Sequence, residues 1–129
     1  LTTDVIAGFP GETDVEHQES LAFCEEIRFS RMHVFPYSAR PGTAAAAMPD
    51  PVPKAAAAAR ARALIACGEG LRRQYLQKQL GKSLSVLVEK DGIGFATNYV
   101  QVRAGGRAGE IRLVNITGMD KELLIGEEA

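Results

Sequence analysis

The feature that most constrains the fold is the order of elements at the start of the chain: strand, glycine turn, helix, strand. Residues 4–7 form a short apolar stretch, and residues 8–12 read Gly-Phe-Pro-Gly-Glu. A helix is predicted over 13–27, because it opens on a threonine, a favoured N-cap, with Glu16 at the capping-box position. A second strand is predicted over 31–37. Two strands joined through a helix make a right-handed crossover with parallel strands, as at the ligand-bearing face of an α/β barrel.

The middle of the chain changes from a stiff loop to a long helix. Residues 38–53 are rich in proline and alanine, which predicts a loop. Residues 54–80 are predicted to form one helix. Its apolar face, with spacings of three and four, includes Leu64, Cys67, Leu71 and Tyr75. The arginines mostly occupy the other side, which is either an ordinary solvated surface or a contact for RNA phosphates.

After residue 80 the hydrophobic period changes from helical to two, which indicates strands. Asp91-Gly92 is a hairpin signal, and Gly105-Gly106 marks another turn. The strands are expected over 83–89, 95–103, 110–117 and 122–126. Short strands separated by glycine turns predict a small closed or half-closed β-barrel that forms a separate module.

Composition excludes several classes of protein. The chain has 129 residues, of which 46% are hydrophobic, so one domain or two small ones can form a core. The formal net charge of −1 argues against a purely electrostatic nucleic-acid binder. No apolar run approaches the roughly 20 residues of a membrane span. Cys24 and Cys67 do not suggest a secreted disulfide framework; we interpret them as buried thiols on helices, with a redox or metal role as the alternative.

Two motifs at fixed spacing identify a family. The first is Ile6 followed by Gly-Phe-Pro-Gly-Glu-Thr over 8–13, and the second is Phe-Pro-Tyr-Ser over 35–38 with the Arg-Pro-Gly-Thr-Ala loop of 40–44. Together they resemble the late strands of the radical S-adenosylmethionine (SAM) domain in the tRNA methylthiotransferase family. The resemblance covers essentially the whole chain.

The resemblance implies an α/β plus all-β fold in three parts. Residues 1–53 are expected to be the C-terminal βαβ portion of a radical-SAM partial TIM-like barrel, and residues 54–80 a connecting helix. Residues 81–129 are expected to be a small antiparallel TRAM β-barrel that binds RNA. Because the chain begins inside a strand and shows no signal peptide, we expect it to be a fragment of a cytoplasmic protein.

The glycine turn is the first candidate site. Glycine lets a backbone approach a ligand, and a helix N-terminus offers free N–H groups, although a strand-glycine-helix segment is more often only a turn. The resemblance implies that this region lies beside bound SAM. The SAM-binding residues expected are Ile6, Gly8, Phe9, Pro10, Gly11, Glu12, Phe35, Tyr37 and Ser38.

The run from His33 to Ser38 looks most like the branch that modifies threonylcarbamoyl-adenosine in tRNA. The sister branches act on isopentenyl-adenosine in tRNA or on an aspartate of a ribosomal protein. Arg40 is the candidate substrate residue, because a guanidinium can bind the carboxylate of the threonylcarbamoyl group in a bidentate manner. The alternative is a solvated loop arginine. For His33, which could also be a ligand, a packed or hydrogen-bonded side chain is the simpler interpretation.

In the β-module, the family commonly has an Asn-Tyr pair in its second strand. The candidate RNA-binding residues are Lys82, Lys90, Asn98, Tyr99 and Arg103. Tyr99 can stack on an unpaired base of a tRNA anticodon loop, or it can be an ordinary aromatic of the barrel wall.

The family's radical-SAM [4Fe–4S] cluster is ligated by three cysteines with Cys-x3-Cys-x2-Cys spacing, and a second cluster by three cysteines of an N-terminal domain. Neither set has a match here. The resemblance implies that the parent protein supplies both clusters upstream, cleaves SAM reductively and methylthiolates C2 of a modified adenine at position 37. This chain alone is predicted to be inactive.

The open edges of its two parallel strands predict that the chain dimerises, swaps strands or is partly disordered. A free-standing RNA-binding protein is the rival hypothesis.

Overall fold

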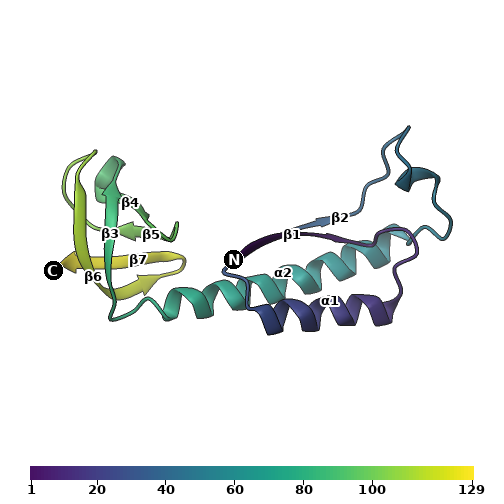
Figure 1. The fold of residues 1–129 in the computed structure, drawn as a ribbon, viewed down its shortest axis with the longest axis horizontal. Coiled ribbons are helices and arrows are strands. Elements are labelled where there is room, and N and C mark those ends of the chain that lie inside the picture. Colours follow the sequence, from purple (N-terminus) through teal and green to yellow (C-terminus); the bar gives the residue numbers. More distant parts are fainter. The chain divides into compact units, whose positions relative to one another are not determined.

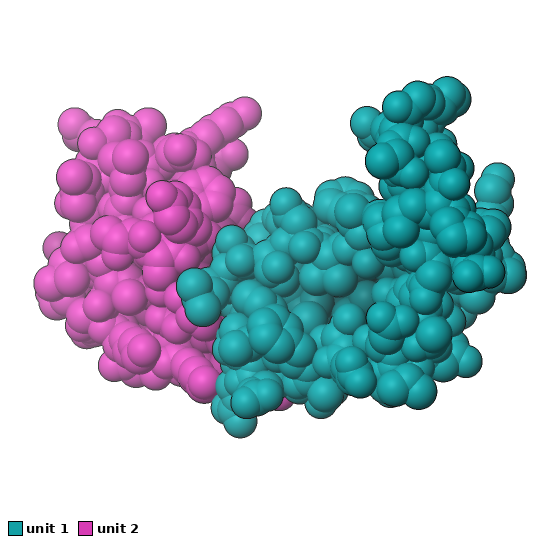
Figure 2. All heavy atoms as spheres, turned by 45° about the vertical axis from the view of Figure 1, so that its right-hand side comes forward, with its two compact units in different colours: residues 1–72 teal, residues 73–129 magenta.

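The computed structural model describes residues 1–129, which divide into two compact units. Residues 1–72 make up unit 1 and residues 73–129 make up unit 2, as the colours of Figure 2 show. The expected division at residues 53 and 80 by function remains a prediction. No helix in either unit is both long and apolar enough to cross a lipid bilayer.

Unit 1 contains the predicted βαβ arrangement. Strands β1 (Thr2–Ala7) and β2 (Arg31–Pro36) pair in parallel, with Thr2 opposite Arg31 and Ala7 opposite Pro36. Helix α1 (Asp14–Ile27) connects them. Its Thr13 N-cap and Glu16 form the predicted capping box. A short 3-10 helix, η1 (Ala45–Ala47), interrupts the loop that follows.

Helix α2 (Lys54–Gln77) ends three residues earlier than predicted. The chain turns at 78–81, where Gly81 has φ +84°. The Gln79 side chain donates a 3.0 Å hydrogen bond to the carbonyl of Tyr75, which satisfies a group exposed by the end of the helix.

The two helices cover one face of the two-stranded sheet, as Figure 1 shows. Ala7, Cys24, Ala61 and Leu64 are buried there, with partly buried side chains of both strands packed around them. On the opposite face the side chains are exposed. Those of β1 and β2 that pair across this open face are Thr2 with Arg31, Asp4 with His33, and Ile6 with Phe35.

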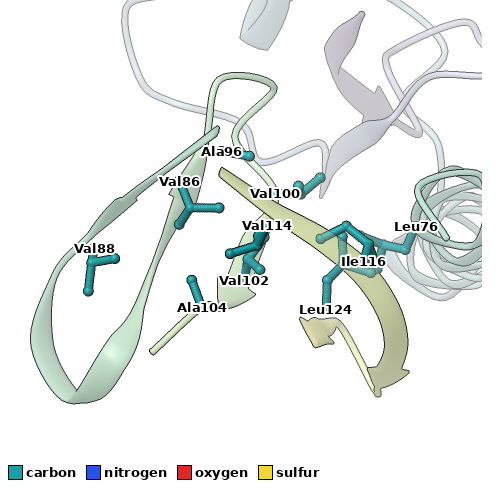
Figure 3. Packing of buried hydrophobic residues seen from close by; sticks show 10 residues of the cluster. All are labelled: Leu76, Val86, Val88, Ala96, Val100, Val102, Ala104, Val114, Ile116 and Leu124. Atoms are coloured by element: carbon teal, nitrogen blue, oxygen red, sulfur yellow. The ribbon is translucent and has the colours of Figure 1, made fainter. Parts of the chain in front are cut away.

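Unit 2 is a closed five-stranded barrel with the strand order β3-β4-β5-β7-β6. The strands are β3 (Ser83–Val88), β4 (Ile93–Ala96), β5 (Gln101–Arg103), β6 (Ile111–Asp120) and β7 (Leu123–Glu128). A 3-10 turn, η2 (Lys90–Gly92), joins β3 to β4 at the predicted hairpin. The barrel encloses a core of valine, leucine, isoleucine and alanine (Figure 3). Its ten buried members are Leu76, Val86, Val88, Ala96, Val100, Val102, Ala104, Val114, Ile116 and Leu124.

Two details of the barrel differ from the prediction. The expected strand over 95–103 is two strands, β4 and β5, because the chain turns between Ala96 and Val100. The N–H of Tyr99 donates to the carbonyl of Ala96 (2.9 Å), and the N–H of Ala96 donates to the carbonyl of Val100 (3.0 Å). The barrel is also mixed rather than antiparallel, because β5 pairs with β7 in parallel.

Candidate functional site

The glycine turn follows the carboxyl end of β1 and precedes α1. Gly8 (φ +79°) and Gly11 (φ +84°) both adopt the left-handed backbone region that favours glycine. Gly8 also lies directly against α2: a β-carbon there would overlap the side chain of Ala57 and come within 2.9 Å of its Cα. The glycine at this position therefore serves the packing of the turn on α2.

The N–H groups of the turn are mostly paired within the protein. Gly8 N–H donates to Glu12 Oε1 (2.9 Å), Gly11 N–H to the Asp50 carbonyl (2.8 Å) and Glu12 N–H to the Phe9 carbonyl (2.9 Å). The capping box occupies the N–H groups of Thr13 and Glu16. These N–H groups are therefore not free to bind a ligand in this conformation.

A basic side chain from α2 joins this turn to the start of α1. Arg60 Nη1 donates to both the carbonyl and Oε1 of Glu12 (2.9 Å each), and Nη2 donates to Asp14 Oδ1 (2.7 Å). We call this arrangement the Arg60 bridge. Its hydrogen bonds to Glu12 and then Asp14 raise the pKa of the Arg60 guanidinium above its ordinary value.

The expected basic face of α2 needs a correction. Arg60 is engaged in the bridge, and Arg72 is buried, with a hydrogen bond of 3.2 Å from its Nη1 to the Ser30 carbonyl. Arg62 and Arg73 are exposed, as are Lys54 and Lys78. Two of the arginines assigned to a solvated or RNA-contacting side therefore hold unit 1 together instead.

Apolar side chains gather near the carboxyl ends of β1 and β2. Ile6 and Phe35 are register partners, and each is 54% exposed. The rings of Phe9 and Tyr37 lie 5.5 Å apart in an edge-to-face arrangement. The Tyr37 hydroxyl is buried and has no hydrogen-bond partner. A buried hydroxyl without a partner is uncommon in folded proteins.

The remaining predicted residues of unit 1 differ in their exposure. Pro10 is buried within the turn, and Ser38 is exposed directly after Tyr37. Arg40 is exposed, and its side chain makes no hydrogen bond or ion pair, while its carbonyl accepts bonds from Thr43. His33 is exposed opposite Asp4 on the open face of the sheet, so the expectation of a packed histidine is wrong in this structure.

The predicted RNA-binding residues of unit 2 differ in their surroundings. Lys82, Lys90 and Arg103 are exposed. Asn98 lies in the turn between β4 and β5, not in a strand, and its Nδ2 donates to Gln79 Oε1 (3.2 Å). Tyr99 lies in the same turn with φ +62° and is 82% exposed. It is therefore not a barrel-wall aromatic, and its ring is accessible for stacking.

Both cysteines lie in the hydrophobic cluster of unit 1, Cys24 buried and Cys67 half-buried. Burial raises the pKa of the Cys24 thiol, with a contribution from Glu25, and burial followed by the charges of Cys24 and Glu25 raises that of Cys67. No group of three or more histidine, cysteine, aspartate or glutamate side chains is arranged to hold a metal ion.

These raised thiol pKa values predict a pH dependence. The folded thiols keep their protons at pH values where unfolded thiols lose them, so the free energy of unfolding falls as pH rises above the ordinary thiol pKa. Below that range the effect is absent. We expect urea unfolding to show a smaller loss between neutral and alkaline pH for the Cys24→Ala/Cys67→Ala variant than for the original chain. Equal losses would contradict the burial of the thiols.

The sequence does not predict the contacts that link distant segments. Arg60 is 48 positions from Glu12, and Gln79 is 19 positions from Asn98. For the Arg60 bridge, the sequence shows only an arginine within an alanine-rich helix and two acidic residues, Glu12 and Asp14, at the start of another helix. That pattern does not indicate that the three side chains contact one another.

The chain is similar to tRNA-modifying enzymes over nearly its whole length. It is 39% identical over 132 residues to the tRNA-2-methylthio-N(6)-dimethylallyladenosine synthase of Streptomyces coelicolor, a match that covers 98% of this chain and 25% of that protein. It is 36% identical over 131 residues to the threonylcarbamoyladenosine tRNA methylthiotransferase MtaB of Thermotoga maritima, covering 97% of this chain and 30% of that protein. No protein-family model matches the chain. The chain thus spans about a quarter of the length of these relatives.

Proposed function

We propose, on the premise that the chain is homologous to the C-terminal region of tRNA methylthiotransferases, that it forms part of a radical-SAM enzyme that methylthiolates an N6-modified adenosine of tRNA. In this proposal unit 1 supplies a wall of the SAM pocket. Unit 2, whose small β-barrel is consistent with a TRAM domain, contacts the tRNA anticodon loop. The [4Fe–4S] clusters would be held by other parts of the parent protein.

The observation that supports this proposal is the apolar and aromatic cluster at the carboxyl ends of two neighbouring parallel strands. In α/β folds ligands bind at that edge. Ile6 and Phe35 are exposed there, and the edge-to-face pair of Phe9 and Tyr37 adds aromatic surface. Exposed apolar and aromatic side chains of this kind fit a ligand with a flat ring that can be stacked or packed against, such as the adenine ring of an adenosine.

These residues would bind and orient the cofactor rather than perform its chemistry. Ile6 and Phe35 would contact its flat ring, and the edge-to-face pair of Phe9 and Tyr37 would border it. When bound, SAM supplies the radical and methyl-transfer chemistry of the reaction. Gly8 and Glu12 would act only on the shape of the turn, because their contacts are within the protein.

Two candidate substrates are compatible with this proposal. The free guanidinium of Arg40, on the loop after β2, favours a substrate with a carboxylate, namely threonylcarbamoyl-adenosine. The 39% identity with an enzyme named for dimethylallyladenosine favours a substrate with an apolar N6 group. The same loop would lie near either group, so the charge of Arg40 distinguishes them.

The proposal is tested with the natural protein that contains this chain, purified without oxygen and supplied with SAM and a reductant. Mass spectrometry of digested tRNA would detect methylthio groups on threonylcarbamoyl-adenosine and on dimethylallyl-adenosine in separate reactions. Methylthiolation of either nucleoside supports the proposal, and Arg40→Ala should weaken only the reaction on the threonylcarbamoyl substrate. Methylthiolation of neither, or modification of a ribosomal protein instead, would refute it.

Tyr99 provides a test of the RNA-binding role of the barrel. We expect Tyr99→Gly to lower the affinity for an anticodon stem-loop about tenfold, since stacking on an aromatic ring is worth about 1–3 kcal/mol per base. The barrel should be no less stable, because glycine adopts the positive φ of this position without strain. Fluorescence anisotropy with labelled RNA and urea unfolding measure the two effects. Tyr99→Phe should retain the affinity; equal binding by all three proteins would exclude stacking.

A further inference from the structure

We propose that Arg60 is a positioning residue: it holds the glycine turn, and with it Phe9, in the shape that the cofactor wall requires. The inference rests on the proposed function, because only a cofactor-binding role gives the shape of the turn a purpose. It adds a residue of α2, outside both recognised motifs, to the determinants of the cofactor site.

The Arg60 bridge is a partly enclosed set of contacts. The side chains of Arg60 and Glu12 are 12% and 14% exposed, whereas Asp14 is 93% exposed. Charge-assisted hydrogen bonds shielded from water are stronger than those on an open surface. The bond to Glu12 should therefore contribute most, and the bond to Asp14 should mainly orient the guanidinium.

The bridge contacts the turn at two oxygen atoms of Glu12, its carbonyl oxygen and Oε1. Glu12 Oε1 accepts from Arg60 Nη1 and also from the N–H of Gly8, each at 2.9 Å. The N–H of Glu12 in turn donates to the carbonyl of Phe9. Through Glu12, Arg60 is thus connected both to Gly8 and to Phe9, the residue that carries the aromatic ring. Without Arg60, the Glu12 carboxylate would be free to turn toward water and release Gly8.

The backbone of α2 lies against the same turn. Ala57, three positions before Arg60, lies against Gly8 so closely that no side chain fits between them. Residues three apart occupy one side of a helix. One side of α2 therefore packs against the beginning of the turn, at Gly8, and forms hydrogen bonds with the end of the turn, at Glu12. These two contacts fix the geometry of the turn at both ends.

The arrangement requires arginine rather than lysine. Two nitrogens of one planar guanidinium reach the Glu12 carbonyl, the Glu12 carboxylate and the Asp14 carboxylate. A single ammonium nitrogen does not reproduce that fork. We therefore expect Arg60→Lys to retain part of the effect, through the Glu12 carboxylate alone.

The first experiment measures amide hydrogen exchange in the 129-residue chain by NMR. In Arg60→Ala we expect exchange at Gly8 and Glu12 to be about tenfold faster or more, the factor for loss of a hydrogen bond to a charged group. Exchange at buried Leu64 should be unchanged. Arg62→Ala, an exposed arginine on the same helix, is the matched control. Unchanged exchange at Gly8, or an equal increase at Leu64, would overturn the inference, since the second result is general destabilisation.

The second experiment measures the dissociation constant of SAM for the natural protein that contains this chain. We expect about tenfold weaker binding by Arg60→Ala, an intermediate value for Arg60→Lys and no change for Arg62→Ala. Equal binding by Arg60→Ala and Arg62→Ala would overturn the positioning role. If the unaltered protein does not bind SAM, the proposed function fails, while the exchange rates still decide whether Arg60 holds the turn.

Discussion

Replacing Gly94 with alanine is expected to destabilise the β-barrel severely. Gly94 lies opposite Val88 where β4 pairs with β3. A β-carbon there would overlap the carbonyl oxygen of Leu87 and lie 2.8 Å from the Cα of Val88. Both obstacles are backbone, so no side-chain rotation relieves them. The two strands would have to separate, and Val88 would leave the barrel core.

The expected cost is large relative to the stability of so small a unit. Overpacking that displaces backbone costs roughly 3 kcal/mol or more. At about 0.05–0.15 kcal/mol per residue, a unit the size of residues 73–129 is stable by only roughly 3–9 kcal/mol. Urea unfolding followed by circular dichroism, and the dispersion of barrel amide signals in NMR spectra, would measure the loss.

Gly70 is the matched control, because it has the opposite surroundings. It lies inside α2, and apart from its chain neighbours and the backbone of the helix itself no atom lies within 4 Å of the position of an added β-carbon. Gly70→Ala should therefore stabilise the chain by about 0.5–1 kcal/mol, the difference between the two residues in a helix. If Gly94→Ala were no more harmful than about 1 kcal/mol, the close approach of β3 and β4 would be refuted.

Local patterns predicted the elements whose determinants are close in sequence. The capping box of Thr13 and Glu16 places both partners within one helical turn, and the Asp91-Gly92 hairpin places its signal between adjacent strands. In both cases the residues that decide the conformation are neighbours. The structure confirms both.

Contacts between distant segments could not be predicted in the same way. Tyr99 has a residue type typical of strands, yet closure of the barrel requires a turn between β4 and β5, and the parallel pairing of β5 with β7 has no local signal. The sequence likewise predicts a solvated side chain for Arg60, and only the fold shows that it lies beside Glu12. The candidate site is thus predictable in its motifs and unpredictable in the contacts that shape it.

Replacing Gly8 with alanine is expected to displace the glycine turn from α2. The variant would combine two costs: an alanine at φ +79°, which costs roughly 1–2 kcal/mol, and overlap of the new β-carbon with Ala57. We expect a total loss of roughly 3 kcal/mol in the free energy of unfolding of unit 1, measured by urea denaturation. In the natural protein, SAM affinity should fall as well, since the N–H of Gly8 would leave Glu12.

Gly11 separates the two costs, because its backbone is equally left-handed (φ +84°) but an added β-carbon has no neighbour within 4 Å. Gly11→Ala should therefore cost only the backbone term, and the difference between the two variants measures the packing of the turn on α2. Adding Ala57→Gly to Gly8→Ala should rescue only part of that difference, because the Cα of residue 57 remains 2.9 Å from the new β-carbon. Equal losses for Gly8→Ala and Gly11→Ala would show that packing against α2 does not constrain the turn. The Arg60 bridge would then be the remaining constraint on the position of Phe9.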